Sequence, residues 1–239
     1  MHPPELDLRL DGFEAADKQT EEAFRRVIQI EQTELVPLAE HHAPDAASYY
    51  VLHNAAATWG TPGEPQIVAL HLQRDLRAKT FRFAHASLPL AAMAQSWLIH
   101  RGCPLEEIGL VPGMGTAPAD EATRELEQRL MGDGHHFTLL RSYTDDSPDD
   151  AVTIVILRSL DERGPSPFRV LHEYVDADSW THTLREGGFA TYAGAVQWCD
   201  DALSGQAPPL PPVQPEVRSA PRPAISLSAL ARRPAGRSR

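Results

Sequence analysis

The run Ala151–Leu157 (AVTIVIL) constrains the fold more than any other stretch of this 239-residue chain. It carries no charge, it holds four β-branched aliphatic residues, and turn residues flank it on both sides. A short apolar run of this kind predicts a strand that is buried on both faces. We therefore expect it inside a sheet that is covered on both sides.

The remaining patterns predict an α+β fold with a mainly antiparallel sheet. The order β-β-β-α occurs twice, in two halves that span residues 44–104 and 135–203. The letters of the halves do not match well enough to indicate an internal repeat. One continuous six-stranded sheet and two packed half-domains both fit this order. The predicted strands are 48–54, 66–72, 80–86, 136–143, 151–157 and 168–175, with a looser segment over 176–189.

Helices are expected before, within and after these strands. Apolar residues at near-helical spacing predict an N-terminal amphipathic helix over 20–40, capped by Thr20 and kinked or ended at Pro37. Further helices are expected between Ser87 and Gly102, over 119–131 with a narrow apolar stripe typical of a peripheral helix, and after Thr191.

The two ends of the chain differ from the predicted globular domain, residues 20–203. Residues 1–19 are expected to be flexible. Residues 204–239 hold eight Pro, six Arg, no Lys and one acidic residue, a composition that predicts a disordered tail. Because the whole chain has a net charge of −11, its body is acidic, which excludes nucleic-acid binding over the whole surface. Any contact with DNA is therefore expected in the tail.

Targeting signals and disulfides are not predicted. No apolar run approaches the roughly 18 residues that a membrane span needs, and the N-terminus lacks a secretory signal pattern. Two cysteines, Cys103 and Cys199, are too few for a disulfide framework. We expect a cytoplasmic protein with reduced thiols and no contact with a membrane.

Three histidines are the candidate metal site. His53, His71 and His85 fall at similar places on three consecutive predicted strands. Three converging imidazoles are typical of a catalytic zinc site, which makes a zinc-dependent hydrolase one alternative function. Spacing alone is weak evidence, so ordinary sheet histidines are the preferred interpretation, and no cofactor is predicted.

Nucleophilic catalysis finds little support in the sequence. Cys103 follows a predicted helix C-terminus, where the helix dipole disfavours a thiolate, and Cys199 lies on an apolar helical stripe. No G-x-S-x-G motif is present. The acidic segment TDDSPDD (144–150) is typical of a solvated turn. An enzyme is therefore less expected than a binding or regulatory protein.

Arginines are the candidate contacts for nucleic acid or a protein partner. An exposed sheet face and basic side chains could contact phosphates, so a direct nucleic-acid-binding protein is a second alternative. The candidates on the body are Arg158, Arg169 and Arg185, and those in the tail are Arg232, Arg233 and Arg237.

Two long runs, FRFAHASLPLAAMAQSWLIHRGCP (81–104) and FRVLHEYVDADSWTHTLREGGFATYAGAVQWCDD (168–201), carry a family resemblance. Over about residues 20–213 the chain resembles accessory proteins of actinobacterial integrative and conjugative elements, of the replication-activator (Pra) type. This resemblance implies a regulatory role in replication or excision of a mobile element, and it assigns no residue a role. We therefore expect a non-enzymatic accessory factor that acts on a protein of the replication or recombination machinery.

Overall fold

The computed structural model describes residues 6–29, 34–60, 63–147, 151–160 and 165–214. Its strands form two separate five-stranded sheets, ordered β1-β5-β4-β3-β2 and β6-β10-β9-β8-β7. The first sheet consists of β1 (Glu14–Ala15), β2 (Leu35–His42), β3 (Ala47–Asn54), β4 (Ile67–Asp75) and β5 (Thr80–Leu88). The second consists of β6 (Ala117–Pro118), β7 (Phe137–Asp145), β8 (Val152–Ser159), β9 (Phe168–Asp176) and β10 (Thr181–Phe189).

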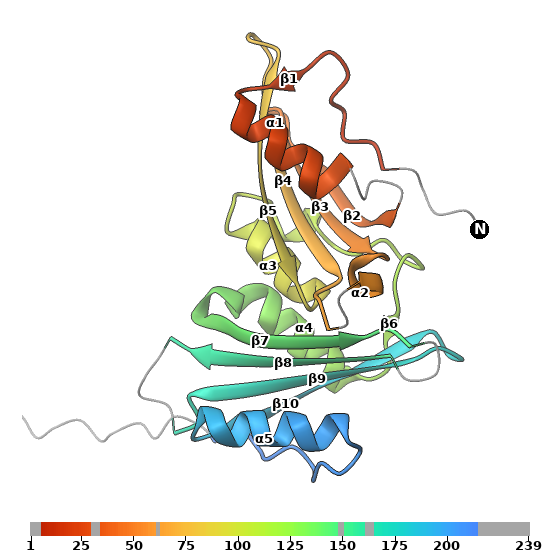
Figure 1. The fold of residues 1–239 in the computed structure, drawn as a ribbon, viewed down its shortest axis with the longest axis vertical. Helices are drawn as coiled ribbons and strands as arrows, with labels where there is room; N and C mark the ends of the chain where they lie inside the picture. Colours follow the sequence, from red (N-terminus) through yellow and green to blue (C-terminus); the bar gives the residue numbers. More distant parts are fainter. Residues whose placement is uncertain (1–5, 30–33, 61–62, 148–150, 161–164, 215–239) are drawn as a thin grey trace, which may run out of the picture.

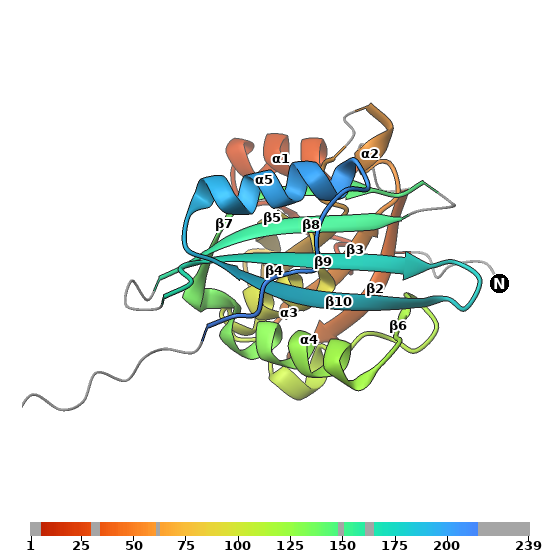
Figure 2. The ribbon, with the colours of Figure 1, turned by 90° about the horizontal axis from the view of Figure 1, so that it is seen from below.

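Helices cover both sheets in alternating layers (Figures 1 and 2). α1 (Lys18–Phe24), continued by a π-helical turn over Arg25–Gln29, lies on the outer face of the first sheet. α3 (Ala91–Ile99) and α4 (Glu121–Asp133) lie between the sheets, and α5 (Tyr192–Leu203) covers the outer face of the second. A short helix, α2 (Ala57–Gly60), follows β3, and single 3-10 turns lie at Leu105–Glu107 and Gly134–His136.

The strand β8 confirms the prediction made for AVTIVIL. It pairs with β7 on one side and with β9 on the other. Val155 and Leu157 enter the core under α4, whereas Ile154 and Ile156 enter the core under α5. The run is apolar throughout because each of its faces is buried by a different helix.

The two halves are structural repeats of the form β-α-β-β-β-β-α, longer than the β-β-β-α order seen in the sequence. β1 pairs in parallel with β5 as β6 does with β10, and α1 and α4 are both capped by an Asp side chain that accepts from the third residue onward. Register shifts fall at the same point of the first long strand pair, Pro37/Ala39 in β2 and Leu139/Arg141 in β7. The α+β class and its two-part architecture are therefore confirmed.

Matching positions in the repeats also share residues once the strands are aligned. Asp75 and Asp176 each accept hydrogen bonds from backbone amides two and three residues onward, in turns that end at Lys79 and Trp180 with φ of 55° and 53°. The next helices carry Ala94 and Trp97 in α3, and Ala195 and Trp198 at the same positions in α5. The similar order of elements was predicted from the sequence, whereas these shared residues were not.

The N-terminal prediction was wrong in its extent. The N-cap is Asp17 instead of Thr20, the helical run is described as far as Gln29, and Leu35–His42 form strand β2 instead of the second half of a helix. Pro37 is compatible with this strand because β2 is an edge of the sheet, where a missing N–H can face away from the partner strand. Leu6 and Leu8, expected to be flexible, are buried against the first sheet.

Two later predictions also need correction. The looser segment after 176 contains β10, and α4 is not peripheral because Leu126 and Leu130 pack between the sheets. Residues 206–213, expected to be disordered, form a strap over β10 and α5: Gly188 N donates to Pro211 O, and Trp198 Nε1 donates to Pro208 O. Residues 215–239 of the predicted tail lie outside the described residues.

A glycine pair in β10 explains how the strap approaches so closely. A Cβ on Gly187 would lie 2.6 Å from Leu210, and one on Gly188 would lie 2.9 Å from the backbone of Val213. Any side chain at these positions would push the strap away.

Among the described residues, no helix is both long enough and apolar enough to cross a membrane.

Candidate functional site

A pocket of about 380 Å³ lies where the two sheets meet. Its walls come from β2, β3 and β4 of the first repeat, from the start of α3, and from α4 and the β7–β10 strands of the second. Most of the lining is apolar, with Leu38, Leu90, Leu110 and Val152 among the contributors. A volume of this order and a largely apolar lining with few polar groups are typical of sites for small organic molecules.

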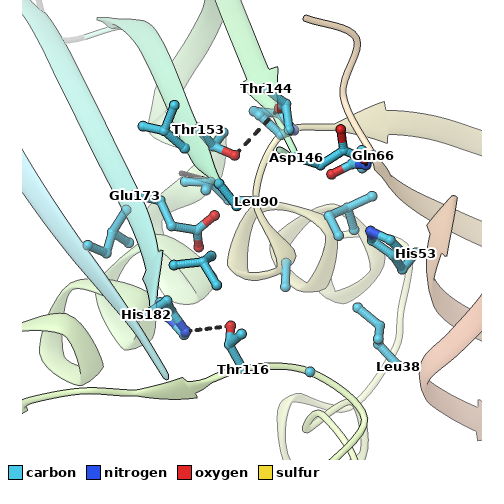
Figure 3. A pocket seen from close by; sticks show the side chains of 18 of the residues that line it. Leu38, His53, Gln66, Leu90, Thr116, Thr144, Asp146, Thr153, Glu173 and His182 are labelled. Atoms are coloured by element: carbon cyan, nitrogen blue, oxygen red, sulfur yellow. Dashed lines mark hydrogen bonds between the residues drawn. The ribbon is translucent and has the colours of Figure 1, made fainter. Parts of the chain in front are cut away.

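The polar groups at one end of the pocket form a connected cluster (Figure 3). His182 on β10 is buried, and both its ring nitrogens are hydrogen-bonded: Nε2 lies 2.9 Å from Glu127 Oε1 on α4, and Nδ1 lies 2.9 Å from Thr116 Oγ1. Glu173 on β9 turns its carboxyl group into the cavity beside them. Glu173 lies deep inside the protein, but part of its surface is accessible because the residue lines the cavity.

The surroundings shift the pKa values of this cluster. Burial raises the pKa of Glu173 to about 7; the neighbouring His182 and Thr153 oppose the rise, and Glu127 adds to it. Burial lowers the pKa of His182, but its hydrogen bond to Glu127 and the charge of Glu173 outweigh burial and leave the pKa above its ordinary value. The pocket therefore holds one carboxyl group that changes charge near neutral pH beside an imidazole whose charged form is favoured by the neighbouring carboxyl groups.

A second polar group lies at the other end of the pocket. Asp146 Oδ2, which follows β7, accepts from Gln66 Nε2 at 2.7 Å and from Thr58 Oγ1 at 2.9 Å. This contact joins the first repeat to the second. His53 lines the pocket nearby, and burial lowers its pKa, which favours the neutral imidazole.

The three histidines expected as metal ligands are not brought together. His71 pairs across the strands with Tyr49 and stacks on its ring, with the centroids 4.7 Å apart. His85 is paired with Leu70, whose side chain enters the core under α1, and His53 lines the pocket. Among the described residues no group of three or more His, Cys, Asp or Glu is placed to bind a metal ion.

The arginines expected to contact nucleic acid are placed differently from one another. Arg169 lies 3.4 Å from Glu186, and Arg185 forms an ion pair with Asp120 at the start of α4, so both hold intramolecular contacts. Arg158 lies exposed on β8. The tail candidates Arg232, Arg233 and Arg237 lie outside the described residues.

The exposed sheet face that the nucleic-acid alternative needs is missing from the described part of the chain. Each face of each sheet carries its own core cluster, under α1, α3, α4 or α5.

The two cysteine thiols are shielded from solvent. Burial is the main cause that raises the pKa of Cys103 and of Cys199 to about 11. Thiols with such pKa values stay protonated at neutral pH and are poor nucleophiles.

Three residues of the site were not predicted from the sequence: Glu127, Glu173 and His182. They lie far apart in the chain, and no motif spacing connects them. One signal was present: Leu171 and Glu173 lie on the same face of an alternating strand, so an acidic residue occupies a position that points into the core.

Comparisons of the chain with family models, with curated proteins and with solved structures each found no match.

Proposed function

We propose that the protein is a non-enzymatic regulatory factor that binds a small, largely apolar molecule in the pocket between its two repeats. The observation that carries the proposal is the pocket itself, a mainly apolar cavity of about 380 Å³ with the Glu173 carboxyl group inside it. Burying a carboxyl group lowers the stability of a protein, and such groups are found mostly at functional sites.

Binding is favoured over catalysis by how the polar groups are used. Both nitrogens of His182 are occupied by Glu127 and Thr116, so neither is free to take a proton from a bound molecule. A general acid–base pair needs a group that can move its proton to the substrate. Within the cluster of Glu127, His182 and Glu173, the carboxyl group of Glu173 points into the cavity, where it can accept hydrogen bonds from a ligand group.

The place of the pocket supports the proposal of a regulatory role. Its walls belong to both repeats, so a ligand would contact both at once and favour the arrangement that fits it best. Such a ligand could set whether the body engages a protein partner. The family resemblance suggests that this partner belongs to the replication or recombination machinery of a mobile element.

The test is an NMR titration of the full chain with 2-phenylethanol, a neutral probe smaller than the pocket. Saturable shifts of amide signals are expected at pocket residues such as Leu90 and Val152. Ala91→Trp, which fills the pocket from α3, should abolish these shifts. Ala193→Trp places the same side chain on exposed α5 and should leave them unchanged. A wild-type protein without saturable shifts in the pocket would contradict the proposal.

A further inference from the structure

The charged groups that line the pocket are strongly biased toward acids. Glu127, Asp145, Asp146 and Glu173 contribute carboxyl groups, and none of the described lining residues is Lys or Arg. The charged form of His182 is favoured by its surroundings, but this side chain is already bound to Glu127. The field inside the cavity is therefore negative, and its low-dielectric walls strengthen that field.

Three of the four carboxyl groups are occupied by partners within the protein. Glu127 holds His182, Asp146 accepts from Gln66 and Thr58, and Asp145 accepts from the backbone and hydroxyl groups of Ser147. Each of these contacts fixes its carboxylate in place.

Glu173 differs from the other three. The Thr153 hydroxyl donates to Thr144, and the carboxyl group of Glu173 points into the open part of the cavity. Two carboxylate oxygens have about four acceptor positions, so most of this capacity is left for a ligand.

We propose that the pocket selects molecules that carry a cationic group, such as an amine or a guanidinium, on an apolar body, with Glu173 as the counter-ion. This inference rests on the proposed binding function and specifies its ligand class. The apolar side chains around Leu38, Leu90 and Leu110 bury the body of the ligand, and Glu173 accepts hydrogen bonds from the cation at the inner end.

An anionic ligand is disfavoured by the same geometry. It would place its charge near Glu173 and Glu127, and the lining offers little to neutralise it: His182 is held by Glu127, and burial lowers the pKa of His53, which favours its neutral form. A neutral ligand can use the apolar walls, but it leaves an ionised Glu173 desolvated without a partner, which costs affinity.

The experiment compares three probes with similar bodies: 2-phenylethylamine, 2-phenylethanol and 3-phenylpropanoate. Each is titrated by NMR into the full chain at about pH 8, where Glu173 is ionised and a primary amine stays protonated. The amine should bind about tenfold more tightly than the alcohol, as expected for a charge-assisted contact, and the carboxylate should bind most weakly. Glu173→Gln should weaken binding of the amine and so remove its advantage, whereas the alcohol should bind at least as tightly as it does to the wild type, because it no longer desolvates an ionised carboxylate.

A matched control separates local from general charge effects. Glu125→Gln removes the same charge from an exposed position on α4, and it should leave all three affinities unchanged. Equal affinities of amine and alcohol, or no loss of amine affinity in Glu173→Gln, would overturn the inference while the pocket still binds the alcohol. If none of the probes binds, the proposed function fails together with the inference.

Discussion

The two repeats place different chemistry at the same three positions. In the first repeat Phe24, Phe81 and Leu72 lie together in the core under α1, and the two aromatic rings meet edge to face at 4.9 Å. In the second repeat the matching positions, counted from the helix N-caps and from the strand registers, hold Glu127, His182 and Glu173.

This difference separates the role of the fold from the role of the site. The backbone of the repeat accepts an apolar trio as ordinary core, so the fold itself does not require polar residues at these positions. The second repeat exchanges that core for an ionisable cluster that opens into the pocket. We expect the exchange to lower stability in favour of binding, as is common at functional sites.

The largest effect is expected when the site is copied into the wrong repeat. Leu72 is fully buried in the first repeat. Leu72→Glu would bury a carboxylate there without an imidazole beside it, and we expect a loss of about 4 kcal/mol or more in the free energy of unfolding. Urea denaturation at neutral pH measures this loss. A loss below about 1 kcal/mol would mean that the two environments differ less than the comparison suggests.

The reverse exchange should stabilise the protein. The triple variant Glu127→Phe, His182→Phe, Glu173→Leu gives the second repeat the trio of the first, and we expect a gain of about 1–4 kcal/mol by urea denaturation. Binding of 2-phenylethylamine should be lost. His182→Phe alone should instead destabilise, because it leaves two neighbouring carboxyl groups without their cation. A triple variant no more stable than this single variant would contradict the comparison.

The dependence of stability on pH should separate the repeats as well. Folding raises the pKa of Glu173 from 4.5 to about 7, so between these values the folded state holds a proton that the unfolded state has released. Stability should therefore fall by roughly 1–3 kcal/mol as the pH rises through this window. The raised pKa of His182 acts in the same direction, since its contribution is lost as the pH rises above its folded value.

Glu173→Gln removes the titrating group, so its stability should change less over the same pH range. Thermal or urea unfolding at several pH values checks this, with Glu125→Gln as the surface control. A slope that is unchanged in Glu173→Gln would show that another group carries it.

The smallest effect is expected at the strap. The first repeat has Ala86 and Ser87 where β10 has Gly187 and Gly188. Gly187→Ala with Gly188→Ser would displace Leu210 and Val213 and cost about 1–2 kcal/mol, a typical penalty of overpacking. Loss of the contact between Trp198 and Pro208 should also change the tryptophan fluorescence. Unaltered fluorescence and stability would mean that the strap is not held by this contact.

Sequence patterns predicted the elements whose residues follow one rule. β8 is apolar on both faces, and α5 has a clear cap at Thr191, so both were found. β2 was not predicted because its apolar residues happen to continue the helical spacing of α1. Only the pairing of β2 with another strand distinguishes the two elements.

The site and β10 were missed for a different reason. The charged and glycine residues of β10 do not form a strand pattern because long-range contacts account for them. Glu186 pairs with Arg169, and the two glycines lie under the strap. His182 and Glu173 lie in separate strands, and Glu127 comes from a helix far along the chain. Their meeting depends on tertiary packing, which local patterns do not encode.

The strap has a further consequence for association between molecules. β10 is bordered by two-residue β6 at one end and by the strap at the other, which leaves little of its edge to bind a foreign strand. The strap contains four prolines, at 208, 209, 211 and 212, which have no backbone N–H group to donate to an added strand. Shortened versions of the protein that end before Gln206 should therefore aggregate more readily than versions that extend to Gln214.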